Sequence, residues 1–342
     1  MAVIPPAACA IHRLMFLTCS EKEALFEAVM AGEQFLDLTP DRISVIVGRP
    51  LRARIPSPAT ILRSAEQDDR MCEALRISIV PIWSESYPPL LRETHDPPFL
   101  LFVRGSLADP GNPQCAIVGT RKPGESARRE TRRFAGALAA HGIPVISGLA
   151  AGIDGEAHRG SLCSAGHTTG VLGSGIDAVY PVSHRRLAEH ILAAGGAVVS
   201  EYPPGFPPLK HHFPQRNRVI SGLSRWVVIM EAPERSGALI TADYALDQGR
   251  ELCVHAVGSS HEAGAAGTRA LLDDGAKRVC EPSDLFDAPA AHMFREHEEG
   301  RRGGSQRHGR ERSDIAHLLA RSLQQELGLS TGSGNGRGVQ RV

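Results

Sequence analysis

The chain has 342 residues, 42% of them hydrophobic and 22% charged, a composition typical of a soluble globular protein with two or three domains. Because 38 basic residues balance 38 acidic ones, a generally basic surface is excluded, and any anion site must be a local patch. The seven cysteines are odd in number, scattered and never spaced as Cys-x-x-Cys, which favours buried thiols in a reducing cytosol.

The N-terminal sequence carries a mildly apolar run that no Lys/Arg-rich segment precedes, and prolines and His12-Arg13 interrupt it. We therefore expect no secretory signal. No window approaches the roughly 20 uninterrupted apolar residues that a membrane-spanning helix needs. We predict a cytoplasmic protein without a membrane partner.

Residues 20–66 show helical spacing in the segments EKEALFEAVMAG, TPDRISVIVG and SPATILRSAEQ. Thr39-Pro40-Asp41 and Ser57-Pro58 mark the starts of the second and third of these helices. These signals predict a small helical (SAM-like) domain over residues 1–72. A proline-rich transition over residues 77–105 then predicts a strand at each of its ends and turns between them.

From residue 115 onward, short apolar runs rich in β-branched residues alternate with segments of helical length and period. Six apolar strands separated by helices predict an α/β fold, a Rossmann-like, doubly wound and mainly parallel sheet, over residues 73–285. The predicted strands lie at 115–120, 144–149, 168–174, 197–202, 225–231 and 251–258.

The C-terminal sequence is rich in glycine and charge without any period, which predicts a flexible linker over residues 286–312. One amphipathic segment, SDIAHLLARSLQQELGLS, follows at 313–330. We predict a single helix and a disordered tail over residues 313–342. One helix cannot form a domain alone, so it must dock, pair with another chain or belong to a degenerate module.

In an open parallel sheet, ligands bind at the carboxyl ends of the strands, where loops and helix N-termini offer backbone N–H groups. A tight turn explains any single glycine at such an end. Together, however, the glycines, hydroxyls and cations at these ends predict an anion-binding surface, which we call the strand-end rim. It comprises Gly119-Thr120-Arg121-Lys122, Ser147-Gly148-Leu149, Gly173-Ser174-Gly175, Ser200-Glu201-Tyr202 and Glu231-Ala232-Pro233.

The motifs of common nucleotide enzymes are missing from these turns. The first turn reads GTRKPGES rather than G-x-G-x-x-G, and no acidic residue ends the second strand, which disfavours NAD. None of the four lysines follows a glycine, so a P-loop is excluded, and no G-x-S-x-G elbow occurs at a strand end. We predict no cofactor.

Asp154 and His158 are spaced i, i+4 near a predicted helix start, as an acid/base pair or half of a metal site would be. The alternative, that Asp154 caps the helix while His158 packs beside it, is favoured because no third ligand has a recognisable spacing. We therefore predict no catalytic residue and no metal site. Ser236 before Gly237 is either an N-cap or a phosphate ligand, and the two roles are compatible.

The stretch HFPQRNRVISGLS places Arg216, Asn217 and Arg218 between the fourth and fifth strands. The arginines could grip phosphate or could be solvated charges at a helix start. Their position favours the first interpretation, with both arginines facing the strand-end rim and Asn217 tied to a neighbouring turn. Glu201 and Glu231 would repel a polyanion unless paired, and this segment holds the nearest cations.

The segments AIVGTRKPG, VISGLAAGIDGEAH, GVLGSGIDAVYP, VVSEYPPG, HFPQRNRVISGLS and VVIMEAPERSGALITADYALDQGR, after an upstream DPPFLLFVRG, closely resemble the DNA-processing protein A family, also called Smf. The likeness covers about residues 75 to 280. It implies a Rossmann-like core that binds single-stranded DNA and forms homodimers. It also implies that the protein protects incoming DNA during natural transformation, loads the RecA recombinase onto it, and is not an enzyme.

The resemblance also implies which residues bind DNA. Arginines and backbone amides hold phosphates without reading bases, so we expect sequence-tolerant, salt-sensitive binding. The implied residues are Gly119, Thr120, Arg121, Lys122, Ser147, Gly148, Gly173, Arg216, Asn217, Arg218, Ser236 and Gly237.

The chain departs from the family pattern in four places. Ala151 stands where the family has an arginine, and Ala256-Val257-Gly258 replaces its Val-Pro-Gly. Arg269 replaces an asparagine, and the single helix at 313–330 stands where many members carry a winged-helix domain, of which it would be a remnant.

Two other functions compete with this interpretation. A Rossmann-like nucleoside-monophosphate phosphoribohydrolase, or another nucleotide-binding enzyme, shares the sheet and the glycine-rich ends. The phosphoribohydrolases would show Pro-Gly-Gly-x-Gly-Thr-x-x-Glu, which is absent from this sequence. A dimeric scaffold that acts only through protein contacts would give no role to Arg121, Arg216 and Arg218.

Overall fold

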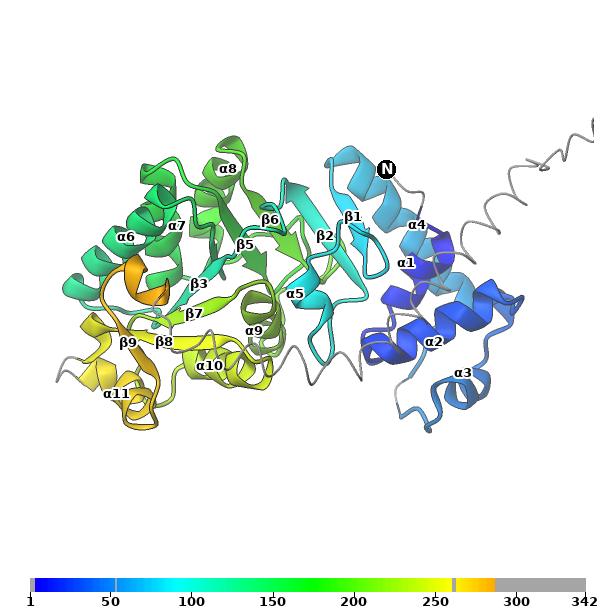
Figure 1. The fold of residues 1–342 in the computed structure, drawn as a ribbon. Coiled ribbons are helices and arrows are strands. Elements are labelled where there is room, and N and C mark those ends of the chain that lie inside the picture. The colour runs from blue at the N-terminus through cyan, green and yellow to red at the C-terminus, as the bar shows by residue number, and fades with distance from the viewer. Residues whose placement is uncertain (1–3, 53, 260–262, 287–342) are drawn as a thin grey trace, which may run out of the picture.

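A computed structural model of the chain describes residues 4–52, 54–259 and 263–286 (Figure 1). The predicted linker beyond residue 286 and the predicted helix and tail over 313–342 lie outside these ranges. The N-terminal part is helical, as predicted, and Thr18, Thr39 and Ser57 cap three of its helices with their side chains. Its elements are α1 (Pro6–His12), α2 (Cys19–Met30), η1 (Phe35–Asp37), α3 (Pro40–Val47) and α4 (Pro58–Ala74).

Helix α1 is absent from the sequence prediction, in which prolines were taken to interrupt this segment. Pro6 instead starts the helix, where its fixed φ suits the first turn and its missing N–H costs nothing. The helix is buried from Ala8 to His12, and the His12 Nε2 donates to the Glu201 carbonyl oxygen at 2.7 Å. The N-terminal helices are thereby hydrogen-bonded to the end of a sheet strand.

Within the described residues, nine strands form one sheet in the order β1-β2-β6-β5-β4-β3-β7-β8-β9. Strands β3 to β9 are parallel, whereas β2 pairs antiparallel with both β1 and β6. The bounds are β1 (Ser78–Pro81), β2 (Leu100–Gly105), β3 (Cys115–Val118), β4 (Val145–Ser147), β5 (Thr168–Leu172), β6 (Ala197–Ser200), β7 (Trp226–Ile229), β8 (Glu251–His255) and β9 (Lys277–Val279).

All six strands predicted after residue 115 are present, as are the two strands of the transition. Helices α6, α7 and α8 lie on one side of the sheet and α9 and α10 on the other (Figure 1). The predicted doubly wound α/β fold is confirmed. The remaining elements are α5 (Pro89–Arg92), α6 (Glu125–Ala140), α7 (Ile153–Cys163), η2 (Val182–His184), α8 (Arg185–Ala193), α9 (His212–Gly222), α10 (Gly237–Asp247), η3 (Ala256–Ser259), η4 (Ala263–Ala265), α11 (Ala266–Asp273) and η5 (Pro282–Phe286).

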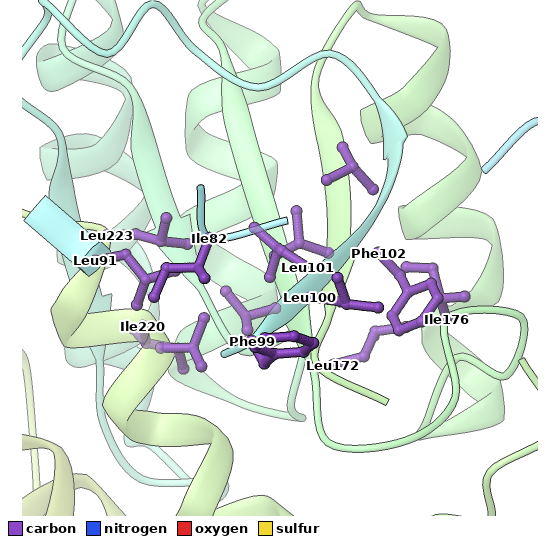
Figure 2. Packing of buried hydrophobic residues seen from close by; sticks show 14 of the residues in the cluster. Ile82, Leu91, Phe99, Leu100, Leu101, Phe102, Leu172, Ile176, Ile220 and Leu223 are labelled. Atoms are coloured by element: carbon purple, nitrogen blue, oxygen red, sulfur yellow. The ribbon is translucent and has the colours of Figure 1, made fainter. Parts of the chain in front are cut away.

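The segment that enters β2 links the N-terminal helices to the sheet. Figure 2 shows Phe99 to Phe102 between Leu91 and Ile220 on one side and Leu172 and Ile176 on the other. The Phe26 and Trp83 rings stack at 4.9 Å, and Phe99 lies edge-on to Trp83 at 5.2 Å. Burying one such side chain contributes about 1.5–3 kcal/mol. The predicted domain boundary at residue 72 therefore falls within a shared hydrophobic core.

Candidate nucleic-acid interface

The loops after β3 and β7 are neighbours, although more than 100 residues separate them in the sequence. The chain runs outward from β3 toward β6 and then returns to β7, which makes the space between β3 and β7 the switch point of the sheet. The backbone N–H of Thr120 donates to the carbonyl oxygen of Glu231 at 2.7 Å across this point. Open α/β sheets bind their ligands at such a position.

An exposed cationic and aromatic surface borders this switch point. Arg121 and Lys122 are exposed in the loop after β3, and the Arg121 guanidinium lies over the Phe213 ring, 6.0 Å from its centroid. The Phe213 ring lies 5.3 Å from that of Tyr180, which is 48% exposed. A Cβ on Gly173 would come within 3.0 Å of the Phe213 ring, so this glycine lets the aromatic ring seat on the strand-end rim.

Tyr180 and Phe213 are absent from the DNA-binding residues predicted from the sequence. Each lies in the connection that follows a strand-end segment already singled out, Gly173-Ser174-Gly175 for Tyr180 and Ser200-Glu201-Tyr202 for Phe213. Aromatic residues on such connections are a signal for base stacking, and this signal could have identified both.

Arg216 lies beneath the strand-end rim instead of facing out of it. It is 5% exposed, and its Nη1 donates to the carbonyl oxygens of Gly148, at 2.8 Å, and of Val171. Burial lowers the pKa of Arg216 to about 10, and the charge of Asp154 opposes this shift. Charge-assisted bonds to two carbonyls compensate the buried cation. The expected orientation of Arg216 toward the rim is therefore wrong.

Asp154 completes this buried arrangement. Its Oδ2 accepts from the backbone N–H groups of Gly148, at 3.0 Å, and Ala150, at 3.3 Å. Burial raises the pKa of Asp154, whereas the charge of Arg216 and the two N–H donors lower it. A Cβ on Gly148 would lie 2.6 Å from that carboxylate and 2.7 Å from the Arg216 guanidinium, so a larger residue there would displace these two buried groups. Asp154 thus stabilises the loop after β4. It was expected to cap helix α7, but Gly152 occupies the N-cap position and Asp154 lies in the first turn of the helix.

Arg218 turns away from the rim toward the N-terminal helices. Its Nη2 lies 2.5 Å from Glu201 Oε1 and 3.9 Å from Asp96 Oδ2. Burial lowers the pKa of Arg218, but the charges of Glu201 and Asp96 outweigh burial and raise it overall. The expected pairing of Glu201 with this segment is confirmed. The expectation that Arg218 faces the rim is wrong, because the carboxylate holds its guanidinium.

The polar side chains of Asn217, Ser236 and Ser147 form hydrogen bonds within the protein, at the rim or just below it. Asn217 Nδ2 donates to the Gly237 carbonyl oxygen at 3.1 Å, which confirms that Asn217 is tied to a neighbouring turn. The Ser236 hydroxyl accepts from the backbone N–H of Ala238 at 3.2 Å as the N-cap of α10. The Ser147 hydroxyl is fully buried and donates to the Ile117 carbonyl oxygen at 2.7 Å, below the rim surface.

His158 is buried and does not reach the rim surface. Its Nδ1 donates to the Thr168 hydroxyl at 2.8 Å, and that hydroxyl donates to Val145. Burial lowers the pKa of His158 to about 3, so the ring is neutral. Among the described residues, no three His, Cys, Asp or Glu side chains are grouped to hold a metal ion. No helix in the described ranges is long and apolar enough to cross a membrane.

Two of the departures from the family pattern have clear positions. Ala151 is exposed in the loop between β4 and α7, so an arginine there would add a cation to the rim surface. Ala256-Val257-Gly258 forms η3, and the Thr268 hydroxyl of α11 donates to the Gly258 carbonyl oxygen at 2.6 Å.

Comparison with known proteins agrees with this architecture. Protein Smf of Escherichia coli is 44% identical over 209 residues, which cover 61% of this chain and 56% of that protein. A structure of DprA from Streptococcus pneumoniae is 32% identical with a TM-score of 0.66 and covers 83% of this chain and 98% of that one. A structure of DNA processing protein A from Helicobacter pylori, described for its unique single-stranded DNA binding mode, is 29% identical with a TM-score of 0.53, over 59% of this chain and 90% of that one.

The chain thus spans little more than half the length of its Escherichia coli relative. The sequence model of the DNA recombination-mediator protein A family matches residues 78–289, from the first strand of the sheet to beyond η5. Because this match covers more than half of the sequence, the chain belongs to the DNA recombination-mediator protein A family.

Proposed function

We propose that the strand-end rim binds the phosphate backbone of single-stranded DNA and that the aromatic rings beside it stack on the bases. The observation that carries this proposal is the Arg121 guanidinium over the Phe213 ring at the switch point of the sheet. Exposed cations beside aromatic faces bind single strands without sequence preference. The Helicobacter pylori relative, described for its single-stranded DNA binding mode, supports the same ligand.

The residues divide between contact and support. Arg121 and Lys122 contact phosphates, and Tyr180 and Phe213 offer ring faces to the bases. Arg216 and Arg218 act behind this surface, where they neutralise Asp154 and Glu201, respectively. Without these pairings, two buried carboxylates next to a polyanion would weaken its binding. The backbone and small side chains complete the rim at Gly119, Thr120, Ser147, Gly148, Gly173, Asn217, Ser236 and Gly237.

The wider role follows from the family. We assign the protein to the processing of incoming single strands in natural transformation and recombination, as a cytoplasmic homodimer that passes the strand to the RecA recombinase. The names of its relatives, DNA processing protein and recombination mediator, support the assignment. We further propose that the protein is not an enzyme. In support, Asp154 and His158, its strongest acid/base candidates, are both engaged in structural hydrogen bonds.

Fluorescence anisotropy with single-stranded oligo-dT and with its duplex tests the proposal. The wild type should prefer the single strand, and Arg121→Ala should weaken that binding about tenfold. Arg129→Ala, which removes an exposed arginine from α6, is the matched control and should bind as the wild type does. Equal affinity for both DNA forms, or normal binding by Arg121→Ala, would exclude the proposed surface.

A further inference from the structure

A cleft of about 820 Å³ separates the N-terminal helices from the segment between β6 and α9. Its walls come from the segment between α1 and α2, from α2, from the start of α4, and from the first turns of α9. This volume lies within the roughly 300–1,000 Å³ of typical ligand clefts. The cleft holds neither Arg121 nor any other exposed residue of the proposed DNA surface.

One wall of the cleft is aromatic. The His212 ring stacks on that of Tyr202 at 4.0 Å, and the Tyr202 ring stacks on that of Phe206 at 6.2 Å. His211 is exposed and lies edge-on to His212 at 4.5 Å. The Arg13 guanidinium lies over the Phe206 ring, 5.1 Å from its centroid. Flat rings beside guanidinium groups offer a nucleobase both stacking and cation–π contact.

The charge of the lining favours an anion. The lining carries four cationic side chains, Arg13, Lys22, Arg54 and Arg218, and two carboxylates, Asp96 and Glu201. Arg13 is paired with Asp68, which lies outside the lining, at 2.5 Å. Both carboxylates already lie within ion-pair distance of Arg218. Arg54 is exposed at the mouth, and no ion pair joins it to any other described residue. A phosphate at the mouth would meet this cation.

Two buried polar atoms on the cleft wall have no hydrogen-bond partner among the described residues. One is Nδ1 of His212, a side chain that is 6% exposed, and the other is Nη1 of Arg218. Leaving a buried polar group unpaired is costly, and such groups in folded proteins normally have a partner. Hydrogen-bonding groups of a bound molecule would supply the missing partners.

The cleft and the strand-end rim share a wall at the start of α9. Phe213 lies against Gly173 and Tyr180 on the rim side, whereas His211 and His212 line the cleft. The loops below are also joined, because the Gly175 N–H donates to the Phe206 carbonyl oxygen at 2.9 Å. A strand that leaves the rim therefore has only this short wall to cross before it reaches the cleft.

We infer that the cleft is a second subsite for the same single strand and holds one nucleotide, its base against Phe206 and His211 and its phosphate near Arg54. This inference rests on the proposed function and adds to it the path of the strand. The N-terminal helices then become part of the DNA-binding surface.

The test uses the full chain, a series of oligo-dT lengths, and the variants Arg54→Ala and His211→Ala. Both residues are exposed, so their replacement leaves the core intact. Arg52→Ala, an exposed arginine outside the cleft, is the matched control. Short oligonucleotides that fill only the rim should bind all proteins alike. Longer ones should bind each cleft variant about tenfold more weakly than the control.

Photocrosslinking of iodouridine-substituted oligo-dT, followed by peptide mapping, gives an independent readout. Crosslinks to Phe206 or His211 support the inference. Free dTMP that competes with long oligonucleotides but not with short ones also supports it. Unchanged binding by both variants at every length, or crosslinks confined to Tyr180 and Phe213, would overturn it. If Arg121→Ala also binds normally, the proposed function fails as well. If only Arg121→Ala binds weakly, the cleft inference alone fails.

Discussion

Arg216 donates to the carbonyl oxygen of Gly148 at 2.8 Å, so an arginine in a motif expected to contact DNA supports the loop next to the DNA surface instead. The same guanidinium contacts the Val171 carbonyl and lies near Asp154. The loop after β4, strand β5 and the first turn of α7 therefore meet on one buried cation. The shape of the strand-end rim depends on this buried cation. The proposed contacts with DNA depend instead on the exposed Arg121 and Lys122.

Arg216→Ala should destabilise the fold. The change leaves two carbonyl oxygens and a buried carboxylate without their cation, and breaking such a buried arrangement costs about 3–5 kcal/mol. Chemical denaturation should show this loss in the free energy of unfolding. The exposed Arg186→Ala is the control and should change it by less than about 0.5 kcal/mol. A stable Arg216→Ala protein with impaired DNA binding would instead make Arg216 a direct ligand.

The Arg218–Glu201 pair should behave as a coupled unit. Removing either partner leaves the other charge buried, so Arg218→Met and Glu201→Gln should each be strongly destabilising. The double variant should lose clearly less than the sum of the two single losses, by about 0.5–3 kcal/mol. A double-mutant cycle in urea measures this coupling. Additive losses would mean that the 2.5 Å contact contributes nothing to stability.

Tyr180→Ala should weaken oligo-dT binding by about 1–3 kcal/mol, because the variant lacks the aromatic ring on which a base stacks. Tyr180 is 48% exposed, so the change should leave stability almost unaltered. Tyr180→Phe retains the ring face without the hydroxyl and should bind as the wild type does. Anisotropy titrations distinguish the two variants. If both bind equally weakly, the hydroxyl matters and stacking does not.

Acid should destabilise the protein through His158. Its pKa falls from an ordinary value of 6.5 to about 3 on folding, because burial disfavours the charged ring. The unfolded chain therefore binds the proton first, so the contribution of His158 to stability is complete above pH 6.5 and is lost as the pH falls toward 3. This residue alone should contribute a slope of about 1.4 kcal/mol per pH unit in that window.

His158→Gln removes the titrating ring and should flatten the dependence of the unfolding free energy on pH by that amount. Denaturant titrations at several pH values measure the slope for both proteins. A variant with the slope of the wild type would show that other groups cause the acid sensitivity. The buried His12, whose pKa burial also lowers, would be the next candidate.

The fold could be predicted because its strands are apolar on both faces. Runs such as Cys115–Val118 and Trp226–Ile229 are buried throughout, which is typical of a parallel sheet under helices. Strand β9, Lys277–Val279, was missed because it is short and carries two basic residues at the sheet edge. Helix α1 was missed because proline both starts and breaks helices.

The positions of the site residues were predicted better than their orientations. Spacing along the sequence places Arg216 and Arg218 on α9 near the strand ends, and the structure agrees. Which way each guanidinium points depends on groups far away in the sequence, the Gly148 and Val171 carbonyls for one and Glu201 for the other. No local pattern contains that information, and so both arginines were expected at the surface.

The salt dependence of oligo-dT binding tests the central claim most directly. Removing one cation that binds a phosphate of a single strand should reduce the slope of log K against log salt concentration by about 0.7. The account predicts that reduction for Arg121→Ala, the same reduction for Lys122→Ala, and none for Arg129→Ala. Equal slopes for the wild type and both loop variants would contradict the claim that the strand-end rim holds the DNA backbone.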